Sequence, residues 1–268
     1  MKPRLIATDF DGTLVRSDWT VSGRTNKVLK ELSSLGVTIV GITGRGPRLR
    51  QLCHRDLPSA DFLVLAQGGF VYQVSGVDDV EALHETYIPG ADVARAVAIV
   101  EREVGPVKVV VENDPTHEST LVGDLIEDWP WPVPMREMSR ADALSGHVVK
   151  AFIRSDTVEA PRLLRTAREL VPAELASLTD AGVGNVEICP PGINKDYGLS
   201  LVAKRLGIAA SDTIAFGDAE NDLSMFAWAG RSIAVANAHD HVKAAADELT
   251  ASNDDDGVAV YLEKLFGL

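Results

Sequence analysis

Two aspartates, Asp9 and Asp11, stand two residues apart directly after the short apolar run Arg4–Thr8. Ligands of open α/β sheets bind at the carboxyl ends of the strands, so both carboxylates are expected to face the crevice there. Such a pair can divide its work, with one carboxylate ionised as a nucleophile or metal ligand and the other protonated as an acid. Gly12 permits a tight turn, and Thr13 can hydrogen-bond local backbone. The same residues would also fit an Asx-type loop that caps a helix.

A second acidic segment, Gly217–Asp222, follows another apolar run. Its Asp218 and Asp222 are four residues apart and would share one face at a helix start, where carboxylates commonly serve only as caps. Together with Asp9 and Asp11, however, they would gather four acids at one sheet edge. Repulsion within such a set favours a hard divalent cation with oxygen ligands. Mg²⁺ is the expected ion, since it takes few carboxylates and keeps waters or phosphate oxygens.

Two further polar segments follow strand-like runs. The run Thr43-Gly44-Arg45 comes after Val37–Ile42, and its hydroxyl and backbone amides at a helix start could hold a phosphate. Lys195 follows a Pro- and Gly-containing turn that would deliver its ammonium group to the same edge. A single lysine is usually a solvated surface residue, and only the combination of the four segments in this order points to a site.

Strands that alternate with helices must position these segments. Val37–Ile42 and Phe62–Ala66 are expected to be strands, and Ser22 is expected to cap a helix that Gly36 ends. That helix would carry Val28, Leu29, Leu32 and Leu35 on one face. The last 75 residues repeat the pattern, with expected helices at Tyr197–Leu206, Asn221–Ala229, His239–Ala246 and Val258–Phe266 and expected strands at Thr213–Phe216 and Ser232–Ala236. This alternation predicts an α/β protein with a Rossmann-like, doubly wound parallel sheet.

The middle of the chain has a different texture, which predicts an inserted α+β domain. The expected division is a core of residues 1–82 and 188–268, with an inserted cap of residues 83–187. Within the cap, helices are expected at Asp92–Val104 and Val158–Val171, and strands at Val107–Val111, Val148–Arg154, Leu175–Thr179 and Asn185–Cys189. The loop Trp129–Pro134 is expected to be rigid packing, and the acidic run Asn253–Asp256 a solvated turn.

The four motifs, in this order, resemble those of the haloacid dehalogenase-like (HAD) superfamily, in its Cof-type group of phosphatases with a type IIB cap. They are Asp9-Phe10-Asp11-Gly12-Thr13, Thr43-Gly44-Arg45, Lys195 and Gly217-Asp218-Ala219-Glu220-Asn221-Asp222. The likeness covers essentially the whole chain, because the C-terminal segments 234–238, 242–246 and 251–259 also resemble blocks of that family. The resemblance implies that the segment Asn253–Asp256 lies near the core, although its composition fits a solvated turn.

The resemblance implies a role for each motif. Asp9 would be the nucleophile that forms an aspartyl-phosphate, and Asp11 the general acid/base that protonates the leaving alcohol and then activates water. Thr43 would hydrogen-bond the transferring phosphoryl group, and Lys195 would balance the charge between that group and the nucleophile. Phosphoryl transfer consists mostly of in-line positioning and charge neutralisation, which agrees with these roles.

The resemblance also implies a metal and a substrate pocket. Mg²⁺ would be held by Asp9, the backbone carbonyl of Asp11 and Asp218, with support from Asn221 and Asp222. The phosphate and substrate would contact Gly12, Thr13, Gly44, Arg45 and Asn221. The chain departs from many relatives at Gln67-Gly68-Gly69, where they have Asn-Gly-Ala, and at Asp196, where they have Gly. Both departures concern the shape of the substrate pocket.

The composition of the chain excludes some classes of binding partner. Among 268 residues, 26 Lys+Arg against 39 Asp+Glu give a net charge of −13, which argues against a nucleic-acid or anionic-membrane surface. No apolar stretch approaches the roughly 18 residues of a membrane span, and the first residues run directly into a strand-like segment without a visible signal peptide. Cys53 and Cys189 have no metal-ligand spacing and suit a reducing compartment. A cytoplasmic protein is therefore expected. The resemblance implies a small phosphorylated metabolite as its partner, and a monomer or a homodimer is expected without a sequence feature that decides between them.

Two other functions stay open at this point. A phosphosugar mutase of the phosphomannomutase type resembles this architecture, but it must grip a second phosphate with converging arginines. Arg162, Arg165 and Arg168 are the obvious candidates. The alternative is a phospho-acceptor or binding module without turnover, which would not need the acid/base residue Asp11. The expected substrates are sugar phosphates or other small phosphomonoesters.

Overall fold

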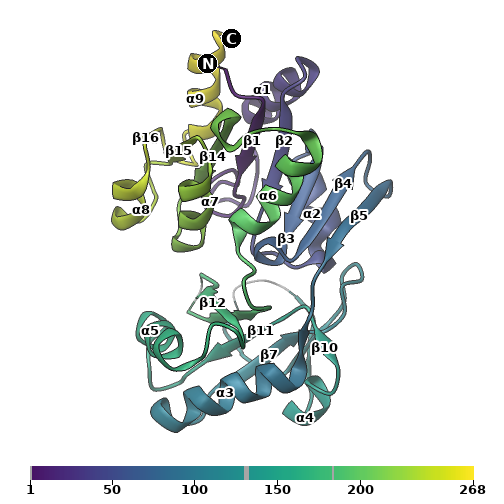
Figure 1. The fold of residues 1–268 in the computed structure, drawn as a ribbon, viewed down its shortest axis with the longest axis vertical. Helices are drawn as coiled ribbons and strands as arrows, with labels where there is room; N and C mark the ends of the chain where they lie inside the picture. The colour runs from purple at the N-terminus through teal and green to yellow at the C-terminus, as the bar shows by residue number, and fades with distance from the viewer. Residues whose placement is uncertain (1, 130–132, 183) are drawn as a thin grey trace. The chain divides into compact units, whose positions relative to one another are not determined.

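The chain folds into two compact units in a computed structural model that describes residues 2–129, 133–182 and 184–268 (Figure 1). The core unit comprises the residues up to Thr43 together with Arg50–His84 and Asn194–Leu268, and the inserted unit comprises Gly44–Leu49 and Glu85–Ile193. The second division falls after residue 193 rather than 187, because the strand Val186–Cys189 pairs within the sheet of the inserted unit. The grouping of Gly44–Leu49 with that unit was not expected from the sequence.

The core unit is built on an eight-stranded sheet of order β16-β15-β14-β1-β2-β3-β4-β5. Its strands are β1 (Leu5–Thr8), β2 (Thr38–Ile42), β3 (Phe62–Leu65), β4 (Phe70–Val74), β5 (Val80–Glu85), β14 (Thr213–Gly217), β15 (Arg231–Ala234) and β16 (Glu248–Leu249). Every residue of β1 and β3 is buried, as expected for strands covered on both faces. The predicted parallel arrangement holds from β16 to β3, whereas β4 runs antiparallel to β3; neither β4 nor β5 was predicted.

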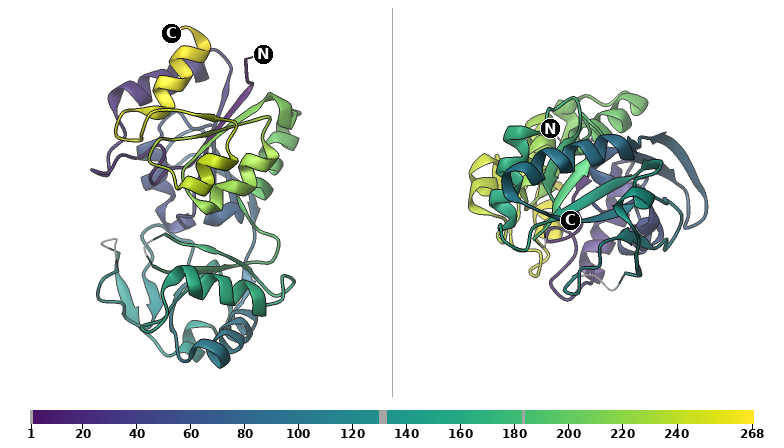
Figure 2. Two further views of the ribbon diagram at one scale, coloured as in Figure 1. Left: turned by 90° about the vertical axis from the view of Figure 1, so that its left-hand side faces the viewer. Right: turned by 90° about the horizontal axis from the view of Figure 1, so that it is seen from below.

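Helices cover both faces of this sheet, with α1 and α9 side by side on one face and α6 and α7 on the other (Figure 2). The helices of the core unit are α1 (Gly23–Ser34), α2 (Arg50–Asp56), α6 (Lys195–Leu206), α7 (Leu223–Trp228), α8 (Asp240–Ala245) and α9 (Gly257–Phe266). Ser22 caps α1 as predicted, accepting a hydrogen bond from the Thr25 amide at 3.0 Å. Leu35 does not join the buried face of α1: it follows the last helical turn and is 64% exposed.

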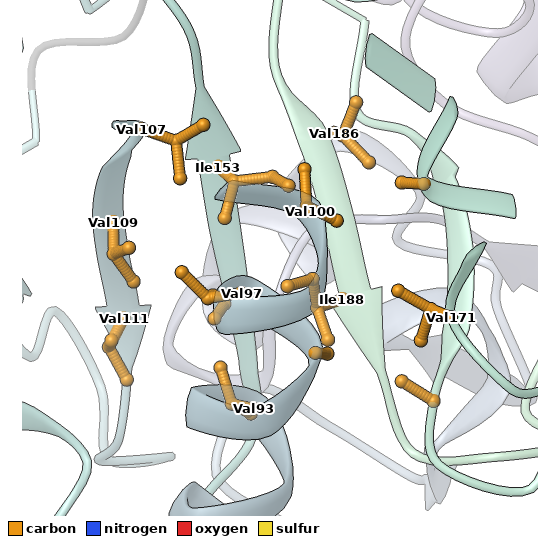
Figure 3. Packing of buried hydrophobic residues seen from close by; sticks show 14 of the residues in the cluster. Val93, Val97, Val100, Val107, Val109, Val111, Ile153, Val171, Val186 and Ile188 are labelled. Atoms are coloured by element: carbon orange, nitrogen blue, oxygen red, sulfur yellow. The ribbon is translucent and has the colours of Figure 1, made fainter. Parts of the chain in front are cut away.

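The inserted unit has a six-stranded sheet of order β12-β13-β11-β7-β8-β9. Its strands are β7 (Lys108–Glu112), β8 (Leu121–Gly123), β9 (Met135–Glu137), β11 (Lys150–Arg154), β12 (Ser177–Asp180) and β13 (Val186–Cys189), beside the short pair β6 (Ile88–Pro89) and β10 (His147–Val148). Helices α3 (Gly90–Val104) and α5 (Ala160–Leu170) pack on one face of the sheet, and α4 (Arg140–Ala143) is a single turn. Figure 3 shows the valines of α3 against those of β7.

Strand alternation places charged side chains on the other face of this sheet. Val109, Val111 and Ile153 belong to the helix-covered core, so Glu112, Lys150 and the neighbouring Glu187 point to the opposite side. All three are buried, at 2%, 3% and 1% exposure. The Lys150 ammonium donates to Glu187 Oε1 and to the backbone carbonyl of Gly44. A buried ionic cluster therefore attaches residues 44–49 to the inserted unit.

Two other expectations concern the inserted unit and the helices. Residues 130–132 of the predicted Trp-Pro loop lie outside the described residues. Trp129, at the start of this loop, packs edge-on against Phe152, with ring centroids 5.2 Å apart. Cys53 and Cys189 are both buried, and neither is in a disulfide. Over the described part of the chain, no helix combines the length and the apolar character that crossing a membrane requires.

Candidate active site

The register of the core sheet brings three loops to one edge. Thr8 of β1 pairs with Gly41 of β2 on one side and with Phe216 of β14 on the other. Asp9, Thr43 and Asp218 follow these three adjacent strands, so their positions lie at the carboxyl edge of the sheet. Thr43 is 1% exposed, and its amide donates to the Val64 carbonyl at 2.9 Å, which fixes the loop after β2.

Lys195 joins this edge from the first turn of α6. Asn194 caps the helix by accepting a hydrogen bond from the Tyr197 amide, so Lys195 begins the helix in a fixed place. Its ammonium is fully buried and donates to Asp9 Oδ1 at 2.6 Å and to Asp222 Oδ1 at 2.5 Å. Burial lowers the pKa of Lys195, but the carboxylates of Asp222 and Asp9 raise it more, so the side chain stays a cation.

Asp222 organises the loop after β14. One of its carboxylate oxygens is taken by Lys195, and the other accepts from the backbone amides of Asp218 and Ala219, each at 3.0 Å. The side chain is 0% exposed. Because both oxygens are engaged within the protein, Asp222 is suited to holding Asp218 and Lys195 in place.

A candidate metal centre lies among the same residues. Within the described residues, Asp9, Asp218 and Asp222 each offer a carboxylate oxygen, and these three atoms lie within 4.8 Å of one another. Burial, followed by the charge of Asp222, raises the pKa of Asp218 to about 6, and burial likewise raises that of Asp9 despite the opposing effect of Lys195. Three close carboxylates with one ammonium leave a negative excess, which a hard divalent cation would balance.

The loop after β1 is fitted closely around Asp218. Thr13 donates its hydroxyl to Asp218 Oδ1 at 2.6 Å, and Gly12 has a φ of +84°. The side chain of Asn237, after β15, donates to the Gly12 carbonyl at 2.7 Å. A Cβ atom at Gly12 would lie 2.5 Å from Asp218 Oδ2, so glycine is required by both conformation and space.

Substituting Gly12 tests this fit, with Gly36 as a matched control. Gly36 has a φ of +83°, but a Cβ atom there would meet nothing within 4 Å. Both alanine variants should lose about 1–2 kcal/mol of unfolding free energy from the left-handed backbone conformation. Only Gly12→Ala should also displace Asp218. It should therefore reduce the catalytic rate of this site by at least about tenfold. Denaturant unfolding and steady-state kinetics of both variants measure the two effects, and equal activity of the two variants would contradict the assigned fit.

The other predicted site residues lie outside the cluster formed by Asp9, Lys195, Asp218 and Asp222. Asp11 is half-buried and forms an isolated bridge with Val15; its carboxylate is outside the three-carboxylate group found among the described residues. Gly44 and Arg45 belong to the inserted unit. Asn221 lies in the same short helical turn as Asp222, and its side-chain amide donates to Gln67 Oε1 at 3.3 Å.

Two asparagines that hold the loop after β1 were not identified as site residues from the sequence. Asn237 holds Gly12, and Asn253 donates its side chain to the Val15 carbonyl at 2.9 Å while its amide donates to Asn237 Oδ1. Asn253 is 7% exposed, so the expectation that its acidic run is merely a solvated turn is wrong for this residue. The signal for Asn237 was its place after a parallel strand, where ligand-binding loops gather.

Comparison with known proteins shows the family of this chain. The profile of the haloacid dehalogenase-like hydrolase family matches residues 6–262. The 5-amino-6-(5-phospho-D-ribitylamino)uracil phosphatase YitU of Bacillus subtilis is 31% identical, over 100% of this chain and 99% of its own. A crystal structure of a haloacid dehalogenase-like hydrolase from Bacteroides thetaiotaomicron superposes with a TM-score of 0.77 at 26% identity, covering 99% of this chain and 100% of that one.

A second solved structure shares the fold. The subclass IIB sugar phosphatase BT4131 superposes with a TM-score of 0.77 over 98% of this chain and 99% of its own, at 21% identity. The fold class predicted from the sequence and the family resemblance are thus both confirmed.

Proposed function

Since this chain belongs to the haloacid dehalogenase-like hydrolases and is a phosphatase of that family, we propose that it hydrolyses small phosphomonoesters with Mg²⁺ through an aspartyl-phosphate on Asp9. The observation that carries this proposal is the buried ammonium of Lys195, which touches Asp9 at 2.6 Å and Asp222 at 2.5 Å. A carboxylate held beside a permanent cation at the carboxyl edge of the sheet is prepared to act as an anionic nucleophile.

Each residue has a defined task in this mechanism. Asp9 attacks phosphorus and forms an acyl-phosphate bond as the ester oxygen departs. Asp11 gives that oxygen a proton and later takes one from the water that hydrolyses the aspartyl-phosphate. Lys195 neutralises charge between Asp9 and the phosphoryl group, and Thr43 donates its hydroxyl to a phosphoryl oxygen.

The residues present fit Mg²⁺. The donor set is made of carboxylate oxygens, which this hard cation prefers, and Asp9 and Asp218 would hold it, with the Asp11 carbonyl as a third ligand and Asn221 and Asp222 in support. When bound, the cation would withdraw charge from the phosphoryl oxygens. Gly12, Thr13, Gly44 and Arg45 would contribute contacts to the phosphate or substrate.

The proposed substrate class is sugar phosphates and related metabolites. The relative YitU is named for a phosphorylated ribitylamino compound, whose phosphate ends a sugar-alcohol chain, and BT4131 is described as a sugar phosphatase. A small phosphorylated metabolite is accordingly the proposed partner, rather than nucleic acid or membrane. A cytoplasmic location is proposed because Cys53 and Cys189 are buried and neither is in a disulfide. A monomer or a homodimer is proposed with it.

A panel of phosphorylated metabolites, assayed for phosphate release with Mg²⁺ and with excess EDTA, tests this function. Release from at least one small phosphomonoester, lost on chelation and restored by Mg²⁺, is expected. Full activity after confirmed metal removal would exclude the metal's role. Transfer of phosphate within a bisphosphorylated sugar would instead support a mutase, for which Arg162, Arg165 and Arg168 lie along α5 as exposed residues. A stable phosphoprotein without release would support a phospho-acceptor module.

Asp218→Asn should have opposite effects on the stability of the metal-free protein and on its binding of Mg²⁺. The pKa of Asp218 is raised from 3.8 to about 6, so the folded metal-free protein binds a proton more tightly than the unfolded chain does. Stability from this group is therefore present at low pH and is lost as the pH rises through about 6.

At pH 7 the ionised carboxylate thus destabilises the metal-free fold, and the amide should raise its melting temperature by a few degrees. The same variant should lose the stabilisation that Mg²⁺ gives the wild-type protein. Calorimetric melting at pH 5 and pH 7, with and without Mg²⁺, measures both effects. If the metal-free Asp218→Asn protein were less stable than wild type at pH 7, the ionised carboxylate of Asp218 would not destabilise the fold.

A further inference from the structure

The turn that follows β3 is conformationally strained and buried. Ala66 and Gln67 both have left-handed backbone conformations, with φ values of 48° and 60°, and Gln67 is 3% exposed. Neighbouring non-glycine residues in this region cost free energy, and such strain persists only where the surroundings over-determine it. The cause of that constraint is found in what the turn contacts.

The backbone of this turn touches two segments of the active site. The Gln67 amide donates to the Thr43 carbonyl at 3.1 Å. At Gly68, which has a φ of +112°, a Cβ atom would overlap the carbonyl oxygen of Asn194, the residue that caps α6 beside Lys195. The turn is thus wedged between the loop that carries Thr43 and the start of the helix that carries Lys195.

The Gln67 side chain reaches a third segment, the acidic loop after β14. Gln67 Oε1 accepts the side-chain amide of Asn221 at 3.3 Å. The other end of the Asn221 carboxamide, Oδ1, is buried and has no hydrogen-bond partner among the residues that the structure describes. Because Gln67 takes the donor end of this carboxamide, the acceptor end is left for another group, and a buried acceptor without a partner is costly.

We propose that Gln67 is a positioning residue that fixes the orientation of the Asn221 carboxamide, so that Oδ1 serves as an acceptor for a hydration water of the cation. Asn221 lies one residue before Asp222 and three after Asp218, within the loop that carries two of the three clustered carboxylates. Mg²⁺ usually keeps several of its waters, and each of them needs an acceptor. This inference rests on the proposed function and adds to it a role for Gln67.

Mg²⁺ binding to the metal-stripped full chain, measured by titration calorimetry without substrate, tests the proposal. Gln67→Met removes the acceptor at nearly constant volume and should weaken Mg²⁺ binding about tenfold, as loss of an outer-shell partner does. Gln67→Glu keeps an acceptor at that place and should bind Mg²⁺ at least as tightly as wild type. Gln73→Met is the matched control, because Gln73 on strand β4 also accepts a side-chain hydrogen bond, from Arg205 at 3.2 Å, but this bond is exposed.

A double-mutant cycle isolates the coupling. In an Asn221→Ala background there is no carboxamide to orient, so adding Gln67→Met should change the Mg²⁺ affinity less than twofold. The inference is overturned if Gln67→Met binds Mg²⁺ like wild type, if Gln67→Glu loses as much affinity as Gln67→Met, or if the two changes are additive. A wild-type chain that binds no Mg²⁺ overturns the proposed function together with this inference, whereas unaltered variants of an active, Mg²⁺-binding enzyme overturn the inference alone.

Discussion

Asp9→Asn is expected to abolish phosphatase turnover. An amide oxygen is a poor nucleophile, and it is a weaker ligand for Mg²⁺ than a carboxylate. The contact with Lys195, which donates to Asp9 Oδ1 at 2.6 Å, can persist with an amide oxygen, so the site should keep its shape. Loss of activity without loss of fold, checked by circular dichroism and melting temperature, would therefore locate the defect in the chemistry. Measurable turnover by this variant would exclude Asp9 as the nucleophile.

Asp11→Asn should give a smaller and substrate-dependent defect. The nucleophile and Lys195 remain, and only the proton shuttle is lost, which is typically worth about 10²–10⁴-fold in rate. An aryl phosphate has a good leaving group that needs little protonation, so formation of the phospho-enzyme should be slowed less for it than for an alkyl phosphate. Single-turnover kinetics of both variants with both substrates measure this difference. Equal slowing of phospho-enzyme formation for the two substrates would show that Asp11 is not the acid.

Much of the core sheet could be predicted because its parallel strands are short, apolar and bounded by polar loops. Since β1, β2 and β14 are adjacent, segments far apart in the chain meet at one edge, and this is why the acidic motifs were expected together. The hydrogen bonds of Lys195 to Asp9 and Asp222 could not be read from spacing, because the turn before α6 has no periodicity. The turn before Lys195 suggested that its ammonium group reaches this edge, and the resemblance to a family supplied its role.

The burial of residues whose position depends on long-range strand pairing could not be predicted from the sequence. Lys150 and Glu187 look like ordinary solvated residues of alternating strands, and their burial follows from the register of β11 beside β13 and β7. Asn253 lies in an acidic run typical of an exposed turn, and only the folded chain shows that its side chain holds the Val15 carbonyl. Local composition carries no information on either arrangement.

The buried ion pair of the inserted unit should respond to mutation in a characteristic way. Lys150 contacts Glu187, and both lie near Glu112, whose pKa is raised by burial and lowered only in part by Lys150 and Arg48. Lys150→Met would leave Glu187 buried without its cation and would remove the donor to the Gly44 carbonyl. We expect it to reduce the unfolding free energy by about 3–5 kcal/mol.

Removing both charges should recover most of the unfolding free energy that Lys150→Met loses. In Lys150→Met/Glu187→Leu the Glu187 carboxylate is gone and the buried Glu112 keeps Arg48 at 3.9 Å as its cation. Apolar replacements of a buried pair are often neutral. Arg154→Met is the control, because Arg154 lies on the same face of β11 but pairs with Asp128 in a more exposed ion pair at 2.7 Å, worth about 0–1 kcal/mol. Denaturant unfolding, with hydrogen exchange of peptides from β11 to report on the inserted unit, measures all three variants. If the double variant were as unstable as Lys150→Met, packing around the lysine rather than the uncompensated charge of Glu187 would govern the stability of this unit.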